Sequence, residues 1–339
     1  MSKKKIVFLI IIAVVLLCTA GFILYKIVND GMATNRRTIT VDDTKYYMKD
    51  NIYNIMVLGI DKDGPIENET GEIGDNGQSD VVVVLSIDKD SGEVKIIEIP
   101  RDSIVSVDES GGKGLSNYIR DEQLCLQYAY AHNSAEGAEL TKRIVEDLLQ
   151  IDIDNYVALS FGGLADVVDF VEGVDIEFSN DYRIFSKIHD PSDPHWINYK
   201  AGDTEHMCGT QVLDFVQYRD TSINYTNLDR MDREKDFVNA FITKAKAYIK
   251  DDYSKATDFI PVISPYMTTD INPTQYVSLA SMALTAKYNM DNIVKIPGES
   301  QVFNEHDGYI VDREELLKMV LDTYYFIPEK NFLGVDKVD

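Results

Sequence analysis

The sequence is poor in cysteine and in basic residues, and each shortage excludes a class of protein. Three cysteines in 339 residues cannot form the disulfide framework of a small secreted scaffold, and no CxxC or Cys/His spacing typical of a zinc site occurs. Lysine and arginine number 33 against 57 aspartates and glutamates, which gives a net charge of -24. Nucleic-acid binding requires basic surface that displaces counterions, so it is excluded.

Several catalytic motifs are also absent. The chain contains no Walker loop, nucleophile elbow or GxGxxG fingerprint, and its five histidines are scattered. A Ser-His-Asp hydrolase is therefore not supported. Beyond Cys18, the sequence holds only Cys125 and Cys208. We interpret these two as small buried residues, with a single bridge between them left open.

Charged residues are missing altogether from the apolar run Ile6 to Tyr25, which three lysines precede. Twenty helical residues rise about 30 Å, the thickness of a bilayer core, and lysines ahead of such a run predict a cytoplasmic N-terminus. We therefore predict a single-pass membrane anchor over 6–28, with a cytoplasmic tail at 1–5 and the main domain outside the cell. The alternative is a signal peptide cleaved near Ala20.

The remainder is predicted to be a polar stalk at 29–50, one extracellular catalytic domain at 51–330 and a tail at 331–339. Alternating strand and helix patterns in this domain predict an α/β fold, with a mixed central sheet sandwiched between helix layers. Strands are predicted at 51–61, 81–87, 94–99, 155–161, 174–178 and 292–296. Helices are predicted at 135–150, 163–173, 208–218, 230–250, 253–266, 274–288 and 312–326, and a long polar loop at 181–203.

Two aspartates lie at the ends of predicted strands. Asp61 closes the strand at 51–61, and Asp80 precedes the strand at 81–87. If these strands are neighbours, both carboxylates reach one edge of the sheet and offer the oxygen ligands that Mg²⁺ prefers. The positions therefore suit a magnesium site, and the alternative is that each aspartate caps a turn.

Arginines gather in one stretch of this acidic chain, YRDTSINYTNLDRMDREKDF, which contains Arg219, Arg230 and Arg233. A guanidinium group holds an oxyanion with a planar fork of N–H donors. Arg230 and Arg233 share a face near a helix start, where basic residues oppose the macrodipole, so an anion from elsewhere is expected. With Arg101 and Asp102 after another strand, the set is typical of pyrophosphate handling. The alternative is a solvated surface with local ion pairs.

The order of these motifs resembles the LytR-CpsA-Psr family of membrane-anchored glycopolymer transferases, from the anchor to about residue 327. The matching segments are NIMVLGID, GQSDVVVVLSID, VKIIEIPRD, LQYAYAHN, NYVALSFGGLADVVDFVEGVDIEF, GTQVLDFVQYRD and DRMDREKDFV. The resemblance implies a hydrophobic tunnel for a polyprenyl tail. It also implies transfer of a phospho-linked glycan from a polyprenyl-pyrophosphate carrier to a cell-wall acceptor such as peptidoglycan.

The resemblance further assigns roles to individual residues. It implies catalytic roles for Arg101, Asp102, Arg219, Arg230 and Arg233, substrate binding by the same four arginines with Gln217 and Glu234, and Mg²⁺ held by Asp61 and Asp80. In this picture Asp102 orients Arg101, and the arginines stabilise charge as polyprenyl phosphate departs. Phosphoryl transfer depends mainly on positioning and charge, which suits such a set.

Four positions depart from the family's usual pattern. Gln217 replaces an arginine, Cys125 a lysine, Asn227 an aspartate and Glu234 a glutamine. The loss of two cations removes transition-state stabilisation. The alternative function is therefore a catalytically impaired polyprenyl-(pyro)phosphate binding or regulatory protein of the cell envelope. A third hypothesis is a surface scaffold without a ligand.

Overall fold

A computed structural model describes a large part of the chain. The described residues are 36–62, 64–66, 71–186, 195–218, 227–249, 255, 258–272 and 293–328, without the side chains at 217, 227–231, 234, 235, 238, 246, 249 and 293. The predicted anchor at 6–28 lies outside these residues. Within them, no helix combines the length and apolar character that crossing a membrane requires.

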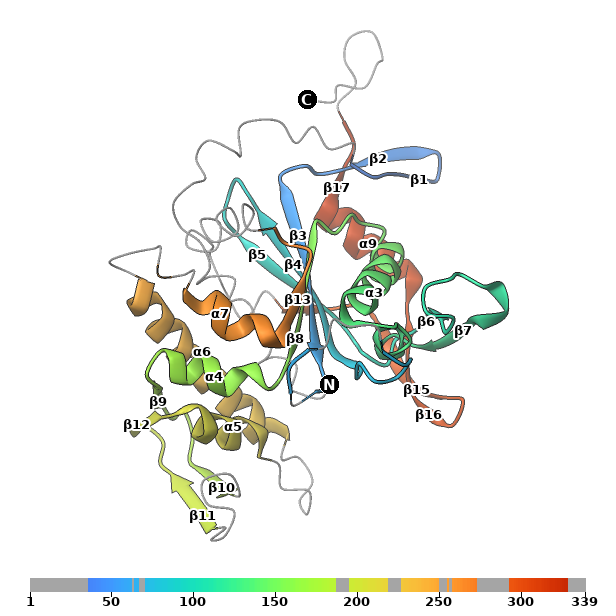
Figure 1. Ribbon diagram of the computed structural model, residues 1–339. Coiled ribbons are helices and arrows are strands. Elements are labelled where there is room, and N and C mark those ends of the chain that lie inside the picture. Colours follow the sequence, from blue (N-terminus) through green and yellow to red (C-terminus); the bar gives the residue numbers. More distant parts are fainter. Residues whose placement is uncertain are drawn as a thin grey trace. The chain divides into compact units, whose positions relative to one another are not determined.

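The largest sheet has six strands in the order β13-β8-β3-β4-β5-β14 (Figure 1). Their bounds are β3 Ile52–Ile60, β4 Ser79–Asp88, β5 Val94–Ile99, β8 Asn155–Ser160, β13 Met267–Thr269 and β14 Ile293–Lys295. β4 and β5 pair antiparallel, whereas β14 runs parallel to β5. The sheet is therefore mixed, which confirms the predicted fold class in its central element.

The chain divides into two compact units. Unit 1 contains the described residues of Gly59–Glu67 and Ala158–Thr285, and unit 2 contains those of Val28–Leu58, Asn68–Val157 and Ala286–Asp339. Each unit has its own core and its own polar clusters, so the two are described separately below.

The core of unit 2 is built on strands β3, β4 and β5. Nearly every position of β4 is buried, including four successive valines, as expected of a strand that is covered on both faces. The tight turn between β4 and β5 forms because Asp88 accepts hydrogen bonds from the backbone N–H groups of Asp90 and Ser91, both at 2.9 Å. The bond from Ser91 is the main cause of a lowered Asp88 pKa.

Two longer helices of unit 2, α3 (Ser134–Leu149) and α9 (Arg313–Tyr324), contact each other (Figure 1). Both begin at a side-chain cap. Asn133 accepts from the Glu136 N–H at 2.9 Å, and Asp312 accepts from the N–H groups of Glu314 and Glu315. Such caps satisfy backbone donors that have no partner inside the helix, which explains where the two helices start.

The rest of unit 2 consists of short elements: β1 (Thr38–Val41), β2 (Thr44–Met48), β6 (Ile104–Asp108), η2 (Ser116–Tyr118), β7 (Ile119–Gln123), α2 (Cys125–Ala129), β15 (Gly298–Phe303), β16 (His306–Val311) and β17 (Tyr325–Phe326). β1, β2 and β17 form a sheet within residues that the sequence suggested were partly stalk. Arg36 is paired with Asp154 at 3.0 Å, so this segment is attached to the unit by buried charge.

Unit 1 contains α4 (Gly163–Phe170), β9 (Val174–Glu177), β10 (Tyr182–Ser186), β11 (His195–Tyr199), β12 (Thr204–Met207), α5 (Gly209–Gln217), α6 (Asn227–Ile249), α7 (Phe259–Ile263) and η4 (Ser264–Tyr266). α4 and α5 approach closely, because a Cβ on Gly209 would lie 2.2 Å from the Ala165 carbonyl oxygen. Only glycine fits at this crossing.

The structure corrects the predicted polar loop at 181–203, which contains the antiparallel strands β10 and β11. Ile184 and Tyr199 are buried, and the Arg183 guanidinium lies 4.2 Å from the centre of the Trp196 ring. A local pattern does not reveal these strands, because each is only five residues long and their exposed residues include both polar side chains and Trp196.

Candidate active site: an arginine between two aspartates

The first candidate site lies in unit 2 directly after β5, where Pro100 separates the end of the strand from Arg101. Arg101 donates from Nε to Asp102 Oδ1 at 3.2 Å, from Nη2 to Gln78 Oε1 at 2.8 Å, and from Nη1 to Asp80. These bonds engage three of the five N–H groups of the guanidinium, and the other two have no partner among the described residues. The sequence prediction that Arg101 and Asp102 act together with Asp80 is therefore consistent with the geometry.

We call Gln78, Asp80, Arg101, Asp102 and Gln123 the Arg101 cluster. Its charged side chains are partly accessible, with 25% exposure for Arg101, 18% for Asp80 and 37% for Asp102. Two carboxylates face one guanidinium, which leaves a local charge of -1 when all three are ionised. This arrangement has both N–H donors for an anion and carboxylate oxygens for a hard cation.

The backbone of the turn that carries Arg101 is fixed by three successive carbonyl groups. The Arg101 carbonyl accepts from the Cys125 N–H at 3.0 Å, and the Ser103 carbonyl accepts from the Leu124 N–H at 2.9 Å. Between them, the Asp102 carbonyl accepts from the Tyr309 N–H at 2.7 Å. Because all three bonds hold one short turn, its side chains leave the sheet in a defined direction.

Sequence analysis did not identify Gln78 and Gln123 as site residues. Gln78 accepts from Arg101, and the buried Cys125 thiol lies 3.7 Å from the same Gln78 oxygen. Gln123 donates to Asp102 and to a backbone carbonyl. Gln78 lies in the matching segment GQSDVVVVLSID, two residues before Asp80, so its place there was the available signal, whereas Gln123 lies in none of the matching segments. Cys125 and Cys208 are unbridged; Cys125 is buried as predicted, whereas Cys208 is exposed, so the interpretation of Cys208 as buried was wrong.

Arg233 in unit 1 has a different environment. Its side chain is 3% exposed, and it donates from Nε to the Phe215 carbonyl and from Nη2 to the Tyr218 carbonyl, both at 2.7 Å. The rings of Tyr182, Phe215 and Tyr218 surround the guanidinium at 5.8 to 5.9 Å. The Arg233 guanidinium therefore lies at the C-terminal end of α5, which is the negative end of the helix dipole.

Asp236 follows Arg233 by three residues in α6 and accepts three hydrogen bonds. The donors are the Ser179 N–H at 2.8 Å, the Ser179 hydroxyl at 3.1 Å and the Tyr182 hydroxyl at 2.8 Å. Burial, together with this carboxylate, raises the pKa of Tyr182 to about 12. This network ties α6 to β10 and fixes the helix that carries the predicted arginines.

The other predicted site residues are only partly described. Asp61 follows β3, is exposed and belongs to unit 1, whereas Asp80 belongs to unit 2. Arg219 lies outside the described residues, as do the side chains of Gln217, Arg230 and Glu234. Across the described side chains, no group of three or more histidine, cysteine, aspartate or glutamate residues is arranged to bind a metal. The magnesium assignment therefore stays a prediction.

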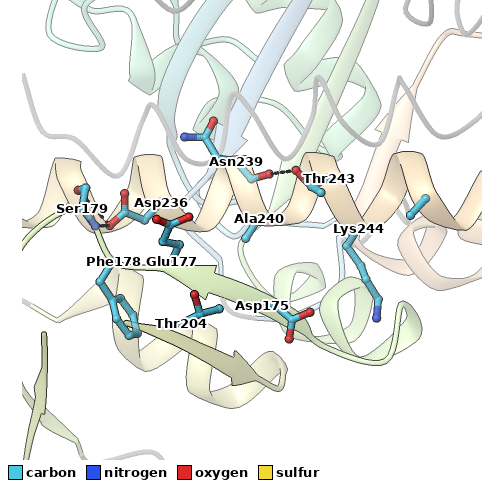
Figure 2. A pocket seen from close by; sticks show the side chains of 11 residues that line it. Asp175, Glu177, Phe178, Ser179, Thr204, Asp236, Asn239, Ala240, Thr243 and Lys244 are labelled. Carbon is cyan, nitrogen blue, oxygen red and sulfur yellow. Dashed lines mark hydrogen bonds between the residues drawn. The ribbon is translucent and has the colours of Figure 1, made fainter. Parts of the chain in front are cut away.

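A separate pocket of about 590 Å³ lies in unit 1 between α6 and the β9–β12 ribbon (Figure 2). The lining residues are Asp175, Glu177, Phe178, Ser179, Thr204, Asp236, Asn239, Ala240, Thr243, Lys244 and Ala247. Most of these residues carry a polar or charged group, and Phe178, Ala240 and Ala247 add apolar surface. The apolar tunnel implied by the resemblance stays a prediction.

Comparison with known sequences identifies the family. The profile of the LytR_cpsA_psr family matches residues 22–323. The chain belongs to this family. The match confirms the resemblance noted in the sequence, and it includes every predicted site residue.

Three known proteins are similar to this chain. TagV of Bacillus subtilis (strain 168), named a polyisoprenyl-teichoic acid–peptidoglycan teichoic acid transferase, is 27% identical, over 96% of this chain and 75% of TagV. TagU of Oceanobacillus iheyensis, which has the same description, is 23% identical, over 91% and 89%. The crystal structure of protein gbs0355 from Streptococcus agalactiae has a TM-score of 0.59 at 20% identity, over 80% and 86%. At that identity, the structural likeness supports the fold alone.

Proposed function

We propose that this LytR_cpsA_psr protein is a membrane-anchored phosphotransferase that moves a glycopolymer from a polyprenyl-pyrophosphate carrier to a cell-wall acceptor such as peptidoglycan. The observation that carries the proposal is the Arg101 guanidinium, held between two carboxylates with N–H groups left for a ligand. The names of TagV and TagU support the choice of a polyisoprenyl-linked donor and a peptidoglycan acceptor.

In the proposed reaction, an acceptor hydroxyl oxygen forms a bond to the phosphorus that carries the glycan. The bond from this phosphorus to the polyprenyl phosphate breaks, and the hydroxyl proton passes to a carboxylate, for which we assign Asp80 or Asp102. The remaining N–H groups of Arg101 stabilise the charge on the departing phosphate. Arg219 and Arg230 are proposed to contribute in the same way, with Gln217 and Glu234 binding substrate. Arg233, whose Nε and Nη2 donate to two backbone carbonyls, would contribute by holding α6 in place.

Magnesium is the cofactor that we propose for this site. The Asp80 carboxylate uses one oxygen toward Arg101, and Asp61 is exposed, so both fit the oxygen ligands that this cation prefers. When bound, Mg²⁺ would neutralise negative charge on the pyrophosphate. Asp61 and Asp80 would hold it.

We also propose that residues 6–28 anchor the chain in the cell membrane, with residues 1–5 cytoplasmic and the main domain extracellular. The supporting observation is the uncharged run behind three lysines. This location would place the domain beside both a lipid-linked donor and the cell wall.

The direct test uses the full chain in detergent with a polyprenyl-pyrophosphate-linked glycan, Mg²⁺ and a peptidoglycan acceptor. We expect release of polyprenyl phosphate together with covalent attachment of the glycan to the acceptor. No release above the rate without protein, measured with and without Mg²⁺, would contradict the proposed reaction.

A second candidate is a lipid-pyrophosphate binding or regulatory protein with impaired catalysis. The observation that favours it is Cys125, whose thiol lies 3.7 Å from the Gln78 side-chain oxygen, at a position where the family usually has a lysine. This candidate predicts that lipid copurifies with the chain without turnover, which mass spectrometry would detect. Q217R should then raise activity, and an unchanged rate in Q217R would count against an impaired enzyme.

A further inference from the structure

We infer that Gln123 is a positioning residue for Arg101 and that it links the Arg101 cluster to the β15–β16 hairpin. The inference rests on the proposed function, in which Arg101 faces the pyrophosphate. Gln123 is the last residue of β7, and its Nε2 donates to Asp102 Oδ1 at 3.2 Å and to the Asp307 carbonyl at 2.6 Å. An amide nitrogen has two hydrogens, so these two bonds use both.

The carboxylate that Gln123 contacts is the one that orients Arg101. Asp102 Oδ1 accepts from Gln123 Nε2 and from Arg101 Nε, each at 3.2 Å. The Asp102 side chain is 37% exposed and would otherwise rotate into water, where a surface ion pair contributes little. Gln123 holds the Asp102 oxygen in place, and this oxygen in turn fixes the direction of the Arg101 guanidinium.

The far end of the link is anchored by the hairpin. β15 and β16 pair in register, with Val302 opposite Asp307. The buried Tyr309 donates from its backbone to the Asp102 carbonyl and from its hydroxyl to the Ile296 carbonyl, each at 2.7 Å. Figure 1 shows the β15–β16 and β6–β7 hairpins side by side, and β16 contacts β6.

The competing interpretation is that Gln123 is an ordinary polar residue of a surface strand. Its neighbours on β7, including Arg120 and Asp121, are exposed, and Asp121 bonds only to Ser106 on the paired strand β6. Gln123 differs because it bonds to two segments outside its own hairpin. A purely structural role would alter stability, but it would not make catalysis depend on the protonation of a group at position 123.

Two substitutions separate these interpretations. Q123L removes both donors, and Q123E replaces them with a carboxyl group that donates only when protonated. At pH 8 we expect kcat to fall about tenfold in both variants, with KM within about twofold of the native value. As the pH falls toward 5, kcat of Q123E should recover relative to the native protein, whereas that of Q123L should not.

The matched control is E122Q on the same strand, because Glu122 makes no side-chain hydrogen bond within the described residues. We expect native kinetics from this control at every pH. Native kcat in both Q123L and Q123E, or the same pH profile for the two variants, would overturn the inference. Thermal unfolding of each variant identifies a folding defect, and recovery of Q123E at low pH decides the question if Q123L does not fold.

A second readout does not depend on turnover. The Arg101 Nε–H signal can be assigned in a ¹⁵N-arginine-labelled chain by its loss in R101K. We expect slow solvent exchange of this hydrogen in the native protein and exchange about tenfold faster in Q123L, because Asp102 is then no longer held. Unchanged exchange in Q123L would overturn the positioning role, whether or not the native chain transfers a glycan. Absence of transfer by the native chain would instead refute the proposed function.

Discussion

Arg101 in unit 2 and Arg233 in unit 1 are both predicted site arginines, yet their environments differ. Arg101 is partly exposed and bonded to two carboxylates and one glutamine. Arg233 is buried, bonded to two backbone carbonyls and surrounded by aromatic rings. The first environment leaves donors for a ligand, whereas the second stabilises the end of a helix.

Arginines that are unusually numerous in part of an acidic chain therefore do not all have the same role. A buried guanidinium is costly unless its donors are satisfied, so Arg233 is expected to contribute mainly to the stability of unit 1. Arg101 is expected to contribute mainly to activity. Three predictions test this division.

The largest expected effect is on stability. R233M should lower the free energy of unfolding of unit 1 by about 3 kcal/mol, because the Phe215 and Tyr218 carbonyls lose their charged donor. Trp196, the only tryptophan of the chain, lies in β11 of unit 1, so its fluorescence reports urea unfolding there. The control K200M removes an exposed pair with Asp181 in the same unit and should leave the stability of that unit nearly unchanged. A loss below about 1 kcal/mol in R233M would contradict the structural role.

The next effect is on activity. R101K keeps the charge but loses the fork that bonds to three acceptors, so the rate of polyprenyl phosphate release should fall about 100-fold. Stability should change by less than about 1 kcal/mol, because the cluster is partly exposed. The control R120K changes an exposed arginine paired with Glu109 and should keep the native rate. Native activity in R101K would remove Arg101 from the proposed site.

The smallest effect is a pH dependence in unit 1. Burial raises the pKa of Tyr182 from 10.0 to about 12, so the neutral phenol is favoured in the folded state. The stability from this shift is complete below pH 10 and is lost as the pH rises from 10 to 12. The Y182F variant lacks the hydrogen bond from the hydroxyl to Asp236, so it is less stable than the native protein at neutral pH. It has no phenol to ionise at position 182, so it does not show the loss of stability at alkaline pH that Tyr182 causes.

The measurement for this prediction is urea unfolding, followed by Trp196 fluorescence, between pH 9 and 12. The stability difference between the native protein and Y182F should narrow across this range. A constant difference between the native protein and Y182F would show that Tyr182 does not titrate as proposed.

The central strands and the longer helices could be predicted from the sequence because burial imposes a strong pattern. β5 has the predicted bounds 94–99, and α6 covers Asn227–Ile249 where 230–250 was predicted. The hairpin β6–β7 was missed because four of the five residues of β7 are polar and its first three are exposed. Pairing of such strands depends on distant segments, which a local pattern does not contain.

The candidate site shows the same limit. The resemblance paired Asp102 with Arg101, whereas the positions at strand ends linked Asp80 to Asp61. The structure places both Asp80 and Asp102 against Arg101. For Arg233, the sequence suggested that an anion from elsewhere meets the positive charge near the helix start. The structure instead shows carbonyl oxygens at the end of α5 as partners of Arg233, which no charge count reveals.

The backbone bond between Asp102 and Tyr309 has a consequence for biosynthesis. A ribosome makes the chain from its N-terminus, so Asp102 emerges roughly two hundred residues before the tyrosine that completes its turn. A product truncated ahead of β16 therefore contains every residue proposed for chemistry but not the strand that sets their geometry. Nascent protein would therefore reach its working form only near the end of synthesis.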